Sequence, residues 1–369
     1  MIANRIRVRI AGGRGYDILV GFGILHRIGG HMKRLGMRGR AFVITSPAIG
    51  HRYLKPLLRG LKSGGYSGVR VGYVPDGEKF KSFSSYSRLS KEIVRFGRND
   101  DERVFVINLG GGVIGDLGGF VAATHRRGVG YVQVPTTLLA LADCGVGGKT
   151  GVDLDGVKNA VGAFHQPKLV YADLGVLRTL SKRELRSALA EIVKYGVIRS
   201  RKFFEFVESN VDRVFSLDRK VMTRIVMESY RMKADIVSRD ELDTRGVRVI
   251  LNYGHTIGHA IESASKYAYR HGEAVSIGMV CANDIAVRLG LLEKSVAARI
   301  ENLLIKIGLP VRIKNRNLGR IMHYFWRDKK FVHGKNRFVL ATGIGRTRVV
   351  EGVPVRLVES VLRSRFIPA

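Results

Sequence analysis

Three histidines, His255, His259 and His271, lie close together in the sequence and carry its strongest chemical signal. A helix would place His255 and His259, at i and i+4, on one face, where both imidazoles can reach one ion. The interval before His271 is long enough for one helix and a reversal, which would bring a third imidazole to the same place. Such a histidine pair can be purely structural, but the flanking glycines and the third histidine favour a metal site.

A catalytic divalent metal usually takes mixed ligands and leaves one position open for substrate, so a carboxylate is expected beside the histidines. Glu191 is the best candidate, because it interrupts the apolar face of the predicted helix in ALAEIVK. Lys194, one turn later, would share that face. An ordinary exposed ion pair between the two residues fits the spacing equally well.

A glycine run, GGGVIGD at 110–116, directly follows a predicted strand and leads into a predicted helix. Glycines there let backbone N–H groups and the helix N-terminus approach a phosphate. The run matches neither the common dinucleotide fingerprint nor a P-loop. A tight strand-to-helix turn is the alternative.

A second glycine loop, GVGGKTG at 145–151, carries Lys149 at its centre. Asp143 precedes it, and Lys158 and Asn159 follow it. A carboxylate, two ammonium groups and an amide in one short region indicate another anion cradle. A mobile surface loop is the alternative.

The first half of the chain alternates β-branched runs with helical patterns, which is typical of a largely parallel sheet flanked by helices. The expected strands are Arg5–Ile10, Arg40–Thr45, Val69–Val74, Arg103–Leu109, Tyr131–Val134 and Leu169–Asp173. The expected helices between them are Ala48–Leu61, Ser82–Phe96 and Val113–Thr124.

Beyond residue 180 the strand signal nearly vanishes. Amphipathic helical patterns cover Lys182–Tyr195, Leu217–Val237, Thr256–Ser265, Ala274–Leu289 and Ser295–Ile307. The sequence therefore predicts an α/β domain over 1–180, with a Rossmann-like sheet, and an all-α domain over 181–369. We expect the active site in the cleft between them.

The net charge of +32 is the most unusual feature of the composition. Clustered basic residues would indicate nucleic acid, but here Lys and Arg are spread through every segment, which favours either a generally basic proteome or a site for anionic substrates. No segment approaches the roughly 18 to 20 apolar residues of a membrane span, and the N-terminus does not resemble a signal peptide. Two cysteines, Cys144 and Cys281, without metal-ligand spacing fit a reducing, cytoplasmic compartment.

Several long motifs, in the same order, resemble the 3-dehydroquinate synthases, and the resemblance runs from about Thr45 to Val355. The matching segments are GGGVIGD at 110–116, RGVGYVQVPTTLLA at 127–140, GGKTGVD at 147–153, KNAVGAFHQP at 158–167, ALAEIVKYG at 188–196, LNYGHTIGHAIE at 251–262, HGEAVSIGM at 271–279 and RDKK at 327–330.

The resemblance implies one divalent metal, zinc or cobalt, held by the residues matching Glu191, His255 and His271. It moves His259 from the metal to the substrate. It also implies a tightly bound NAD, whose contacts match Glu78, Lys81, Gly111, Gly112, Val113, Asp116, Thr136, Thr137, Lys149, Lys158, Asn159 and Thr179.

Substrate contacts carry over to Arg127, Lys149, Lys194, Lys233, Arg248, Asn252, His259 and Lys329 or its neighbour Lys330. Asp143, Lys149, Lys194 and His259 match the catalytic positions. The family acts on an anionic sugar phosphate, 3-deoxy-D-arabino-heptulosonate 7-phosphate. Its NAD takes a hydride from the substrate, phosphate is eliminated, the hydride returns, and ring opening and an intramolecular aldol step give 3-dehydroquinate. Members are commonly homodimers.

The chain departs from the family pattern at two places beside the site. Cys144-Gly145 stands where two serines are usual, and Val157 replaces a glycine, with Gly156 one place earlier. These changes put loop shape in doubt more than the reaction. The alternatives are a cyclase for sedoheptulose 7-phosphate or an aminocyclitol precursor, a polyol dehydrogenase that releases NADH, and a nucleic-acid-binding protein.

Overall fold

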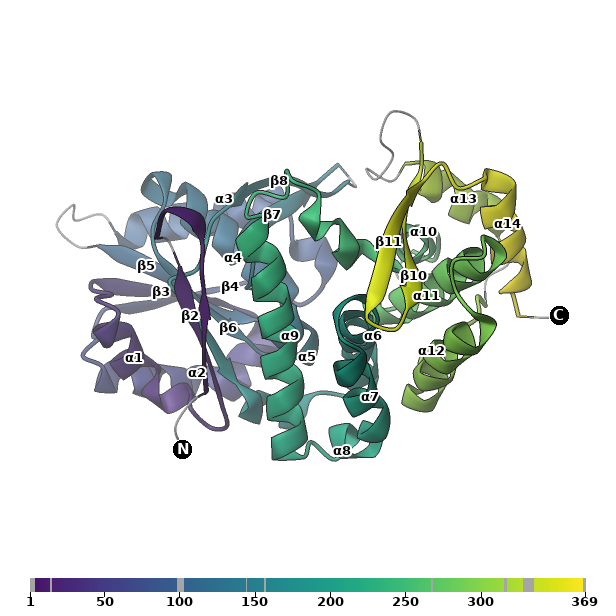
Figure 1. Cartoon of the computed structure of the whole chain (residues 1–369). Coiled ribbons are helices and arrows are strands. Elements are labelled where there is room, and N and C mark those ends of the chain that lie inside the picture. The colour runs from purple at the N-terminus through teal and green to yellow at the C-terminus, as the bar shows by residue number, and fades with distance from the viewer. Residues whose placement is uncertain are drawn as a thin grey trace. The chain divides into compact units, whose positions relative to one another are not determined.

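The computed structural model describes residues 4–13, 15–97, 103–143, 145–155, 157–266, 268–314, 317–327 and 335–367 (Figure 1). The chain forms two compact units. Unit 1 comprises Met1–Leu180 and Met222–Leu242, and unit 2 comprises Ser181–Val221 and Asp243–Ala369. The predicted boundary at residue 180 coincides with the first change of unit. The prediction did not include the return of residues 222–242 to unit 1.

A seven-stranded sheet forms the centre of unit 1, in the order β1-β2-β9-β6-β5-β3-β4. β1 and β2 pair antiparallel, and all the other pairs are parallel. Its strands are β1 (Asn4–Val8), β2 (Tyr16–Gly21), β3 (Arg40–Thr45), β4 (Val69–Tyr73), β5 (Val104–Gly110), β6 (Tyr131–Pro135) and β9 (Leu169–Asp173).

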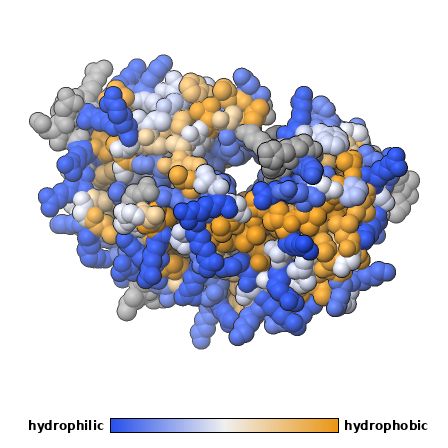
Figure 2. All heavy atoms as spheres, turned by 45° about the horizontal axis from the view of Figure 1, so that its top comes forward, coloured by the Kyte–Doolittle hydropathy of each residue, from blue (hydrophilic) through white to orange (hydrophobic). Residues whose placement is uncertain are grey.

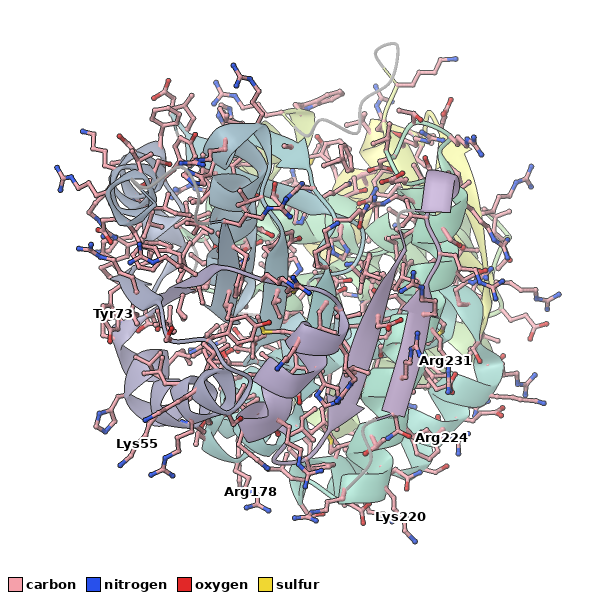
Figure 3. All side chains as sticks on the ribbon, turned by 90° about the vertical axis from the view of Figure 1, so that its left-hand side faces the viewer. Lys55, Tyr73, Arg178, Lys220, Arg224 and Arg231 are labelled. Atoms are coloured by element: carbon pink, nitrogen blue, oxygen red, sulfur yellow. The ribbon has the colours of Figure 1, made fainter. Side chains whose placement is uncertain are left out.

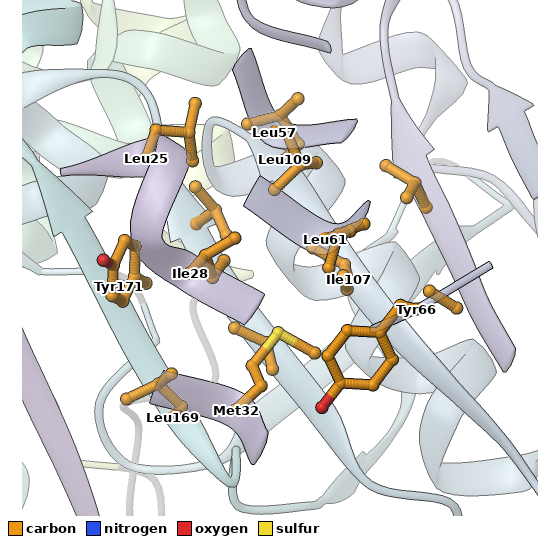
Figure 4. Close-up of a cluster of buried hydrophobic side chains, with 14 of the residues drawn as sticks. Leu25, Ile28, Met32, Leu57, Leu61, Tyr66, Ile107, Leu109, Leu169 and Tyr171 are labelled. Carbon is orange, nitrogen blue, oxygen red and sulfur yellow. The ribbon is translucent and has the colours of Figure 1, made fainter. Parts of the chain in front are cut away.

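Helices cover both faces of this sheet, which explains why central strands such as β5 are buried along their whole length. On one face, Ile28, Met32 and Leu61 pack on Ile107 and Leu109 (Figure 4). The helices of unit 1 are α1 (Ile28–Arg34), α2 (Pro47–Ser63), α3 (Phe83–Phe96), α4 (Gly112–Thr124), α5 (Leu138–Ala142) and most of α9 (Arg219–Arg239), with 3-10 turns at η1 (Ala11–Gly13), η2 (Leu25–Arg27), η3 (Glu78–Phe80), η4 (His125–Arg127) and η5 (Leu174–Thr179).

A hairpin replaces the loop expected after the second glycine run. β7 (Lys149–Leu154) pairs antiparallel with β8 (Val157–Phe164), so Lys149 begins a strand. The glycines remain necessary where strand backbones approach closely: a Cβ on Gly162 would lie 2.2 Å from the carbonyl oxygen of Thr150. The alternative of a mobile surface loop therefore does not hold from residue 149 onward, and the role of the segment as an anion cradle stays a prediction.

Unit 2 is mainly helical. Its helices are α6 (Lys182–Arg199), α7 (Arg201–Ser209), α8 (Val211–Phe215), α10 (His255–Ala264), α11 (His271–Arg288), α12 (Lys294–Ile307), α13 (Leu318–Trp326) and α14 (Val355–Ser364), with a 3-10 turn at η6 (Val247–Asn252).

The prediction of an all-α second domain was wrong in one respect, because β10 (Arg337–Gly343) and β11 (Arg346–Glu351) form an antiparallel hairpin. Phe338 to Ala341 are buried, and the tight turn at Gly343–Gly345 reverses the chain. The arginines of β11 break up the apolar run that would have marked it as a strand. Within the described ranges, no helix has the length and apolar character needed to cross a membrane.

Candidate metal centre and nucleotide site

Three helices of unit 2, α6, α10 and α11, bring the predicted metal ligands together (Figure 1). The Nε2 atom of His255 lies 3.3 Å from Oε1 of Glu191, and the Nε2 atom of His271 lies 3.6 Å from the same oxygen. The two imidazole rings are 5.3 Å apart between centroids. One carboxylate and two imidazoles therefore converge on one point, as predicted.

Glycines allow the three helices to approach this closely. A Cβ on Gly272, next to His271, would lie 1.8 Å from the carbonyl oxygen of Ser187, one turn before Glu191 on α6. The N–H of Gly272 also donates to the Ser187 hydroxyl at 3.1 Å. Between α10 and α11, a Cβ on Gly278 would lie 1.9 Å from the carbonyl oxygen of Gly254. Close backbone packing thus fixes the separation of the ligating side chains.

Ion pairs hold the first turns of α6 and α11 against each other. Arg183 donates to both carboxylate oxygens of Glu273, at 2.7 and 2.8 Å, and Glu184 pairs with Arg270. Glu273 also accepts from the backbone N–H of Arg270, which caps α11. His271, the first residue of α11, is therefore tied to the helix that carries Glu191.

Glu191 is a buried carboxylate in a positively charged surrounding. Its side chain is only 2% exposed and is thus as buried as that of a core residue. The ammonium group of Lys194 pairs with its Oε2 atom. Burial favours the neutral acid, but Lys194, His255 and His271 outweigh it and hold the pKa of Glu191 well below its ordinary value. Glu191 is therefore ionised, as a metal ligand must be.

Each of the two histidines that face Glu191 has an acceptor at its second ring nitrogen. Nδ1 of His255 lies 3.0 Å from the carbonyl oxygen of Tyr253, and Nδ1 of His271 lies 3.4 Å from Oε2 of Glu262. Burial lowers the pKa of the His271 imidazole, but the carboxylates of Glu191 and Glu262 raise it to about 9. Without a metal this ring is therefore a doubly protonated imidazolium at neutral pH. A cation bound at Nε2 would displace the proton from that nitrogen.

These residues fit a divalent cation. The ligand atoms of Glu191, His255 and His271 all lie within 4.8 Å of one another, and among the described residues Glu191 has Lys194 as an ion-pair partner but no hydrogen bond to either carboxylate oxygen. A buried carboxylate without hydrogen bonds is costly unless a cation compensates it. One oxygen and two nitrogens are also a donor set that catalytic zinc accepts.

His259 lies beside this centre without joining it. Its ring centroid is 5.1 Å from that of His255 and 5.8 Å from that of His271, and its side chain is partly exposed. It groups instead with Glu262 and His271, whose ligand atoms lie within 4.8 Å of one another. The role of His259 as a substrate contact stays a prediction.

In unit 1, a second cluster joins residues predicted to contact NAD. Lys81 is 4% exposed, and its Nζ atom lies 2.5 Å from Oδ2 of Asp116 and 2.5 Å from Oδ1 of Asn159. Burial lowers the pKa of Lys81, but Asp116 outweighs this effect and raises it overall. Glu78 and Lys158 form a longer pair, at 3.8 Å. Residues far apart in the sequence thus form one polar group.

The glycine run behaves as predicted for a strand-to-helix junction. Gly111 precedes the first turn of α4, and Gly112 and Val113 begin the helix. A Cβ on Gly111 would touch the Thr137 side chain at 3.4 Å, and the N–H of Thr136 donates to the Gly110 carbonyl at 3.1 Å. Thr179 ends η5, where its hydroxyl is hydrogen-bonded to Tyr53.

The predicted substrate contacts are divided between the units. In unit 1, Nζ of Lys233 on α9 lies 2.9 Å from Oδ1 of Asp143, while Lys149 and Arg127 are exposed. In unit 2, Arg248 on η6 is 5% exposed, and Asn252 ends the same turn. Lys329 and Lys330 lie outside the described residues, as do Cys144 and Gly156.

Glu262 is the residue near the metal centre that the sequence analysis did not single out. A signal was present, because Glu262 follows His259 by three residues and His255 by seven, and so shares their face of α10.

Two family models match the chain. The model described as 3-dehydroquinate synthase N-terminal covers residues 71–187, and that described as 3-dehydroquinate synthase C-terminal covers residues 188–331. A 3-dehydroquinate synthase of Pelotomaculum thermopropionicum is 42% identical over 344 residues, 93% of this chain and 92% of the relative. That of Thermodesulfovibrio yellowstonii is 40% identical over 348 residues, 94% of this chain and 96% of the relative.

Solved structures of enzymes with other names share the fold. A 2-deoxy-scyllo-inosose synthase complexed with carbaglucose-6-phosphate, NAD+ and Co2+ is 26% identical, with a TM-score of 0.88 over 98% of this chain and all of that one. A glycerol dehydrogenase described as probable, from Sinorhizobium meliloti, has a TM-score of 0.64 at 13% identity, over 93% of this chain and 94% of that one, which shows a common fold alone. Both family models and relatives at 40% identity or more over almost the whole length place this chain in the 3-dehydroquinate synthase family.

Proposed function

We propose that this chain converts 3-deoxy-D-arabino-heptulosonate 7-phosphate to 3-dehydroquinate and phosphate, using one divalent metal ion and bound NAD. The observation that carries the proposal is the buried Glu191 carboxylate, which faces Nε2 of His255 and Nε2 of His271 within a chain that belongs to this family. Relatives under the same family name span nearly its full length.

Glu191, His255 and His271 would hold the metal, and the cluster around Lys81 would hold part of the nucleotide. When bound, the metal supplies positive charge beside the substrate hydroxyls, and NAD accepts a hydride and returns it within one turnover. The related 2-deoxy-scyllo-inosose synthase was solved with NAD+ and Co2+, which supports both assignments.

Lys194 has a position suited to both metal and substrate. Its ammonium group is 3% exposed and pairs with Glu191, so it compensates the carboxylate in a dry surrounding. Because Lys194 already holds a positive charge at the centre, it also favours negative charge that develops on a nearby substrate oxygen. We assign it a catalytic role on this ground.

Asp143 and Lys233 form a second such pair in unit 1, with side chains 33% and 9% exposed. The substrate carries a carboxylate and a phosphate, so several cations are needed to bind it. Arginine suits planar anions and lysine supplies a point charge. Lys233, Arg248, Lys149 and Arg127 meet this demand, and we infer that all four contact the substrate.

The deciding experiment incubates purified protein with the heptulosonate phosphate, NAD+ at catalytic concentration and a divalent metal. Phosphate release and the absorbance of 3-dehydroquinate should rise together, while no net NADH accumulates. Sedoheptulose 7-phosphate serves as the control substrate and should release no phosphate. Failure to form 3-dehydroquinate would overturn the proposal, and net NADH with a polyol would assign the chain to the dehydrogenases.

We also infer a homodimer, as is common in the family. Light scattering of the purified protein at several concentrations measures the molar mass directly. A mass near twice 40.9 kDa agrees with this inference. The monomer mass at every concentration contradicts it.

A further inference from the structure

The two ligating histidines are oriented by different kinds of acceptor. For His255 the acceptor is a backbone carbonyl, that of Tyr253, whose own hydroxyl donates to Oδ1 of Asn283 at 2.6 Å inside the core. For His271 the acceptor is the side chain of Glu262. Of the two acceptors, only Glu262 is a carboxylate. It can be removed by a substitution, whereas the backbone carbonyl of Tyr253 cannot.

Glu262 is a buried carboxylate that contacts an imidazole. It is 7% exposed, on α10, and its Oε2 atom faces Nδ1 of His271 from the side opposite Glu191. Burying a carboxylate is costly, so its presence beside an imidazole implies a compensating interaction. The imidazole has one nitrogen for each carboxylate.

We propose that Glu262 is a positioning residue for the metal centre: its carboxylate accepts the Nδ1–H of His271 and so turns the free electron pair of Nε2 toward the metal. Neutral imidazole carries one proton, and a carboxylate that accepts from Nδ1 keeps that proton on Nδ1 and leaves Nε2 unprotonated. Carboxylate acceptors of this kind also make the ligating nitrogen more basic. This inference rests on the proposed metal site.

A competing role for Glu262 is that of a ligand, since His259, Glu262 and His271 also have ligand atoms within 4.8 Å of one another. That site would need Nδ1 of His271 as its donor. The same ring would then bridge two cations and would have to lose both protons. The orientation of Nε2 toward Glu191 favours one metal, with Glu262 outside its ligand set.

The test compares Glu262→Gln with the wild-type protein. Glutamine keeps the size and can still accept a hydrogen bond, but it lacks the negative charge. We expect affinity for Zn2+ and Co2+, measured by competition with a chromophoric chelator, to fall roughly 10- to 100-fold. The visible absorption spectrum of the Co2+ form should shift, because the His271 nitrogen becomes a weaker donor.

Two further variants control this result. Glu262→Asp keeps a carboxylate and should bind metal more tightly than Glu262→Gln. If Glu262 had only a structural role, the two variants would bind metal equally. Glu293→Gln removes one exposed negative charge from the same unit and should leave metal affinity unchanged. Thermal unfolding of the metal-free proteins reports separately on folding.

Unchanged affinity and an unchanged Co2+ spectrum in Glu262→Gln would overturn the inference. So would two metal equivalents in the wild type, one of which is lost in the variant, because Glu262 would then be a ligand. A wild type that binds no divalent metal overturns the proposed function as well. A wild type that binds metal and depends on Glu262, yet makes no 3-dehydroquinate, contradicts only the proposed function.

Discussion

The two imidazoles that face Glu191 each present Nε2 to its carboxylate, while Nδ1 meets a different acceptor, and this arrangement is visible only in three dimensions. The i, i+4 spacing suggested that His255 and His259 bind one ion together, but the ring facing Glu191 beside His255 is that of His271. Helical spacing says which residues share a face, not which ring the neighbouring helix meets. Resemblance to the family, rather than spacing, singled out the group that the structure brings together around Glu191, and its role as the ligand set stays a prediction.

Substitution of the two histidines tests this assignment. We expect His271→Ala to lose metal more severely than the roughly 10- to 100-fold cost of an outer partner. His259→Ala should retain metal and lose turnover, since its ring lies outside the group around Glu191. Metal content by atomic emission and turnover by phosphate release measure the two effects. Equal loss of metal in both variants would show that this division of roles is wrong.

Cys281 should be unreactive in the folded protein. It is fully buried on α11, and burial raises the pKa of its thiol to about 12, so almost no thiolate is present at neutral pH. We expect a Cys144→Ser variant to give no reaction with a disulfide reagent when native and one equivalent after unfolding. Rapid reaction of the native variant would mean that α11 opens readily.

His125 makes stability depend on pH. It is 9% exposed, its Nε2 atom has no hydrogen-bond partner among the described residues, and burial together with Arg126 lowers its pKa below 6.5. The unfolded chain then takes up a proton at a higher pH than the folded one, so stability falls as pH decreases through the window below 6.5.

We therefore expect His125→Gln to lose less stability than the wild type between about pH 7.5 and pH 5.5. Urea unfolding midpoints at each pH provide the measurement. His51→Gln, at an exposed position on α2, is the matched control and should retain the wild-type slope. An identical slope in His125→Gln would refute the role of His125.

At the scale of elements, amphipathic helices and apolar strands were predicted well because their signal is local. The expected helix 82–96 and strand 40–45 agree with α3 and β3 to within a residue. β2 was missed because YDILVG is nearly continuous in apolar residues and shows no alternation. The β7–β8 and β10–β11 hairpins were missed because polar residues and glycines interrupt or bound their short apolar stretches, and only cross-strand pairing makes them strands.

The approach of α11 to α6 tests whether helix packing sets the metal geometry. Gly272→Ala places a methyl group 1.8 Å from the Ser187 carbonyl, so the helices must separate. We expect a loss of about 1–3 kcal/mol in stability and weaker metal binding. Gly30→Ala, in α1 with nothing within 4 Å, is the control and should stabilise by up to about 1 kcal/mol. Full metal affinity in Gly272→Ala would contradict this account.

At the scale of the whole molecule, the charge of +32 is distributed rather than gathered into one strip. Figure 2 shows hydrophilic side chains over much of the visible face, and Figure 3 shows Lys55, Arg178, Arg224 and Arg231 at the surface. Their exposure agrees with this view. The net charge follows from the sequence alone, but the fold determines which charged side chains form ion pairs. Arg365, for example, forms ion pairs with both Asp284 and Glu301.

This excess charge should assist capture of an anionic substrate. Long-range attraction raises the association rate and is screened by salt, with a Debye length of about 10 Å at 0.1 M. We expect the KM for the sugar phosphate to rise several-fold between roughly 20 and 300 mM KCl, while kcat changes little. Steady-state kinetics at each salt concentration would measure this. A KM independent of salt would exclude electrostatic steering.

The return of residues 222–242 to unit 1 has a consequence for the order in which the protein can be made. During synthesis, the sheet of unit 1 is complete once β9 has emerged, yet the segment 222–242, which supplies Lys233, leaves the ribosome only after residues 181–221 of unit 2. Unit 2 in turn waits for Asp243 and beyond. A gene cut after residue 180 would therefore yield two incomplete fragments, and neither unit could be exchanged between relatives by a single crossover.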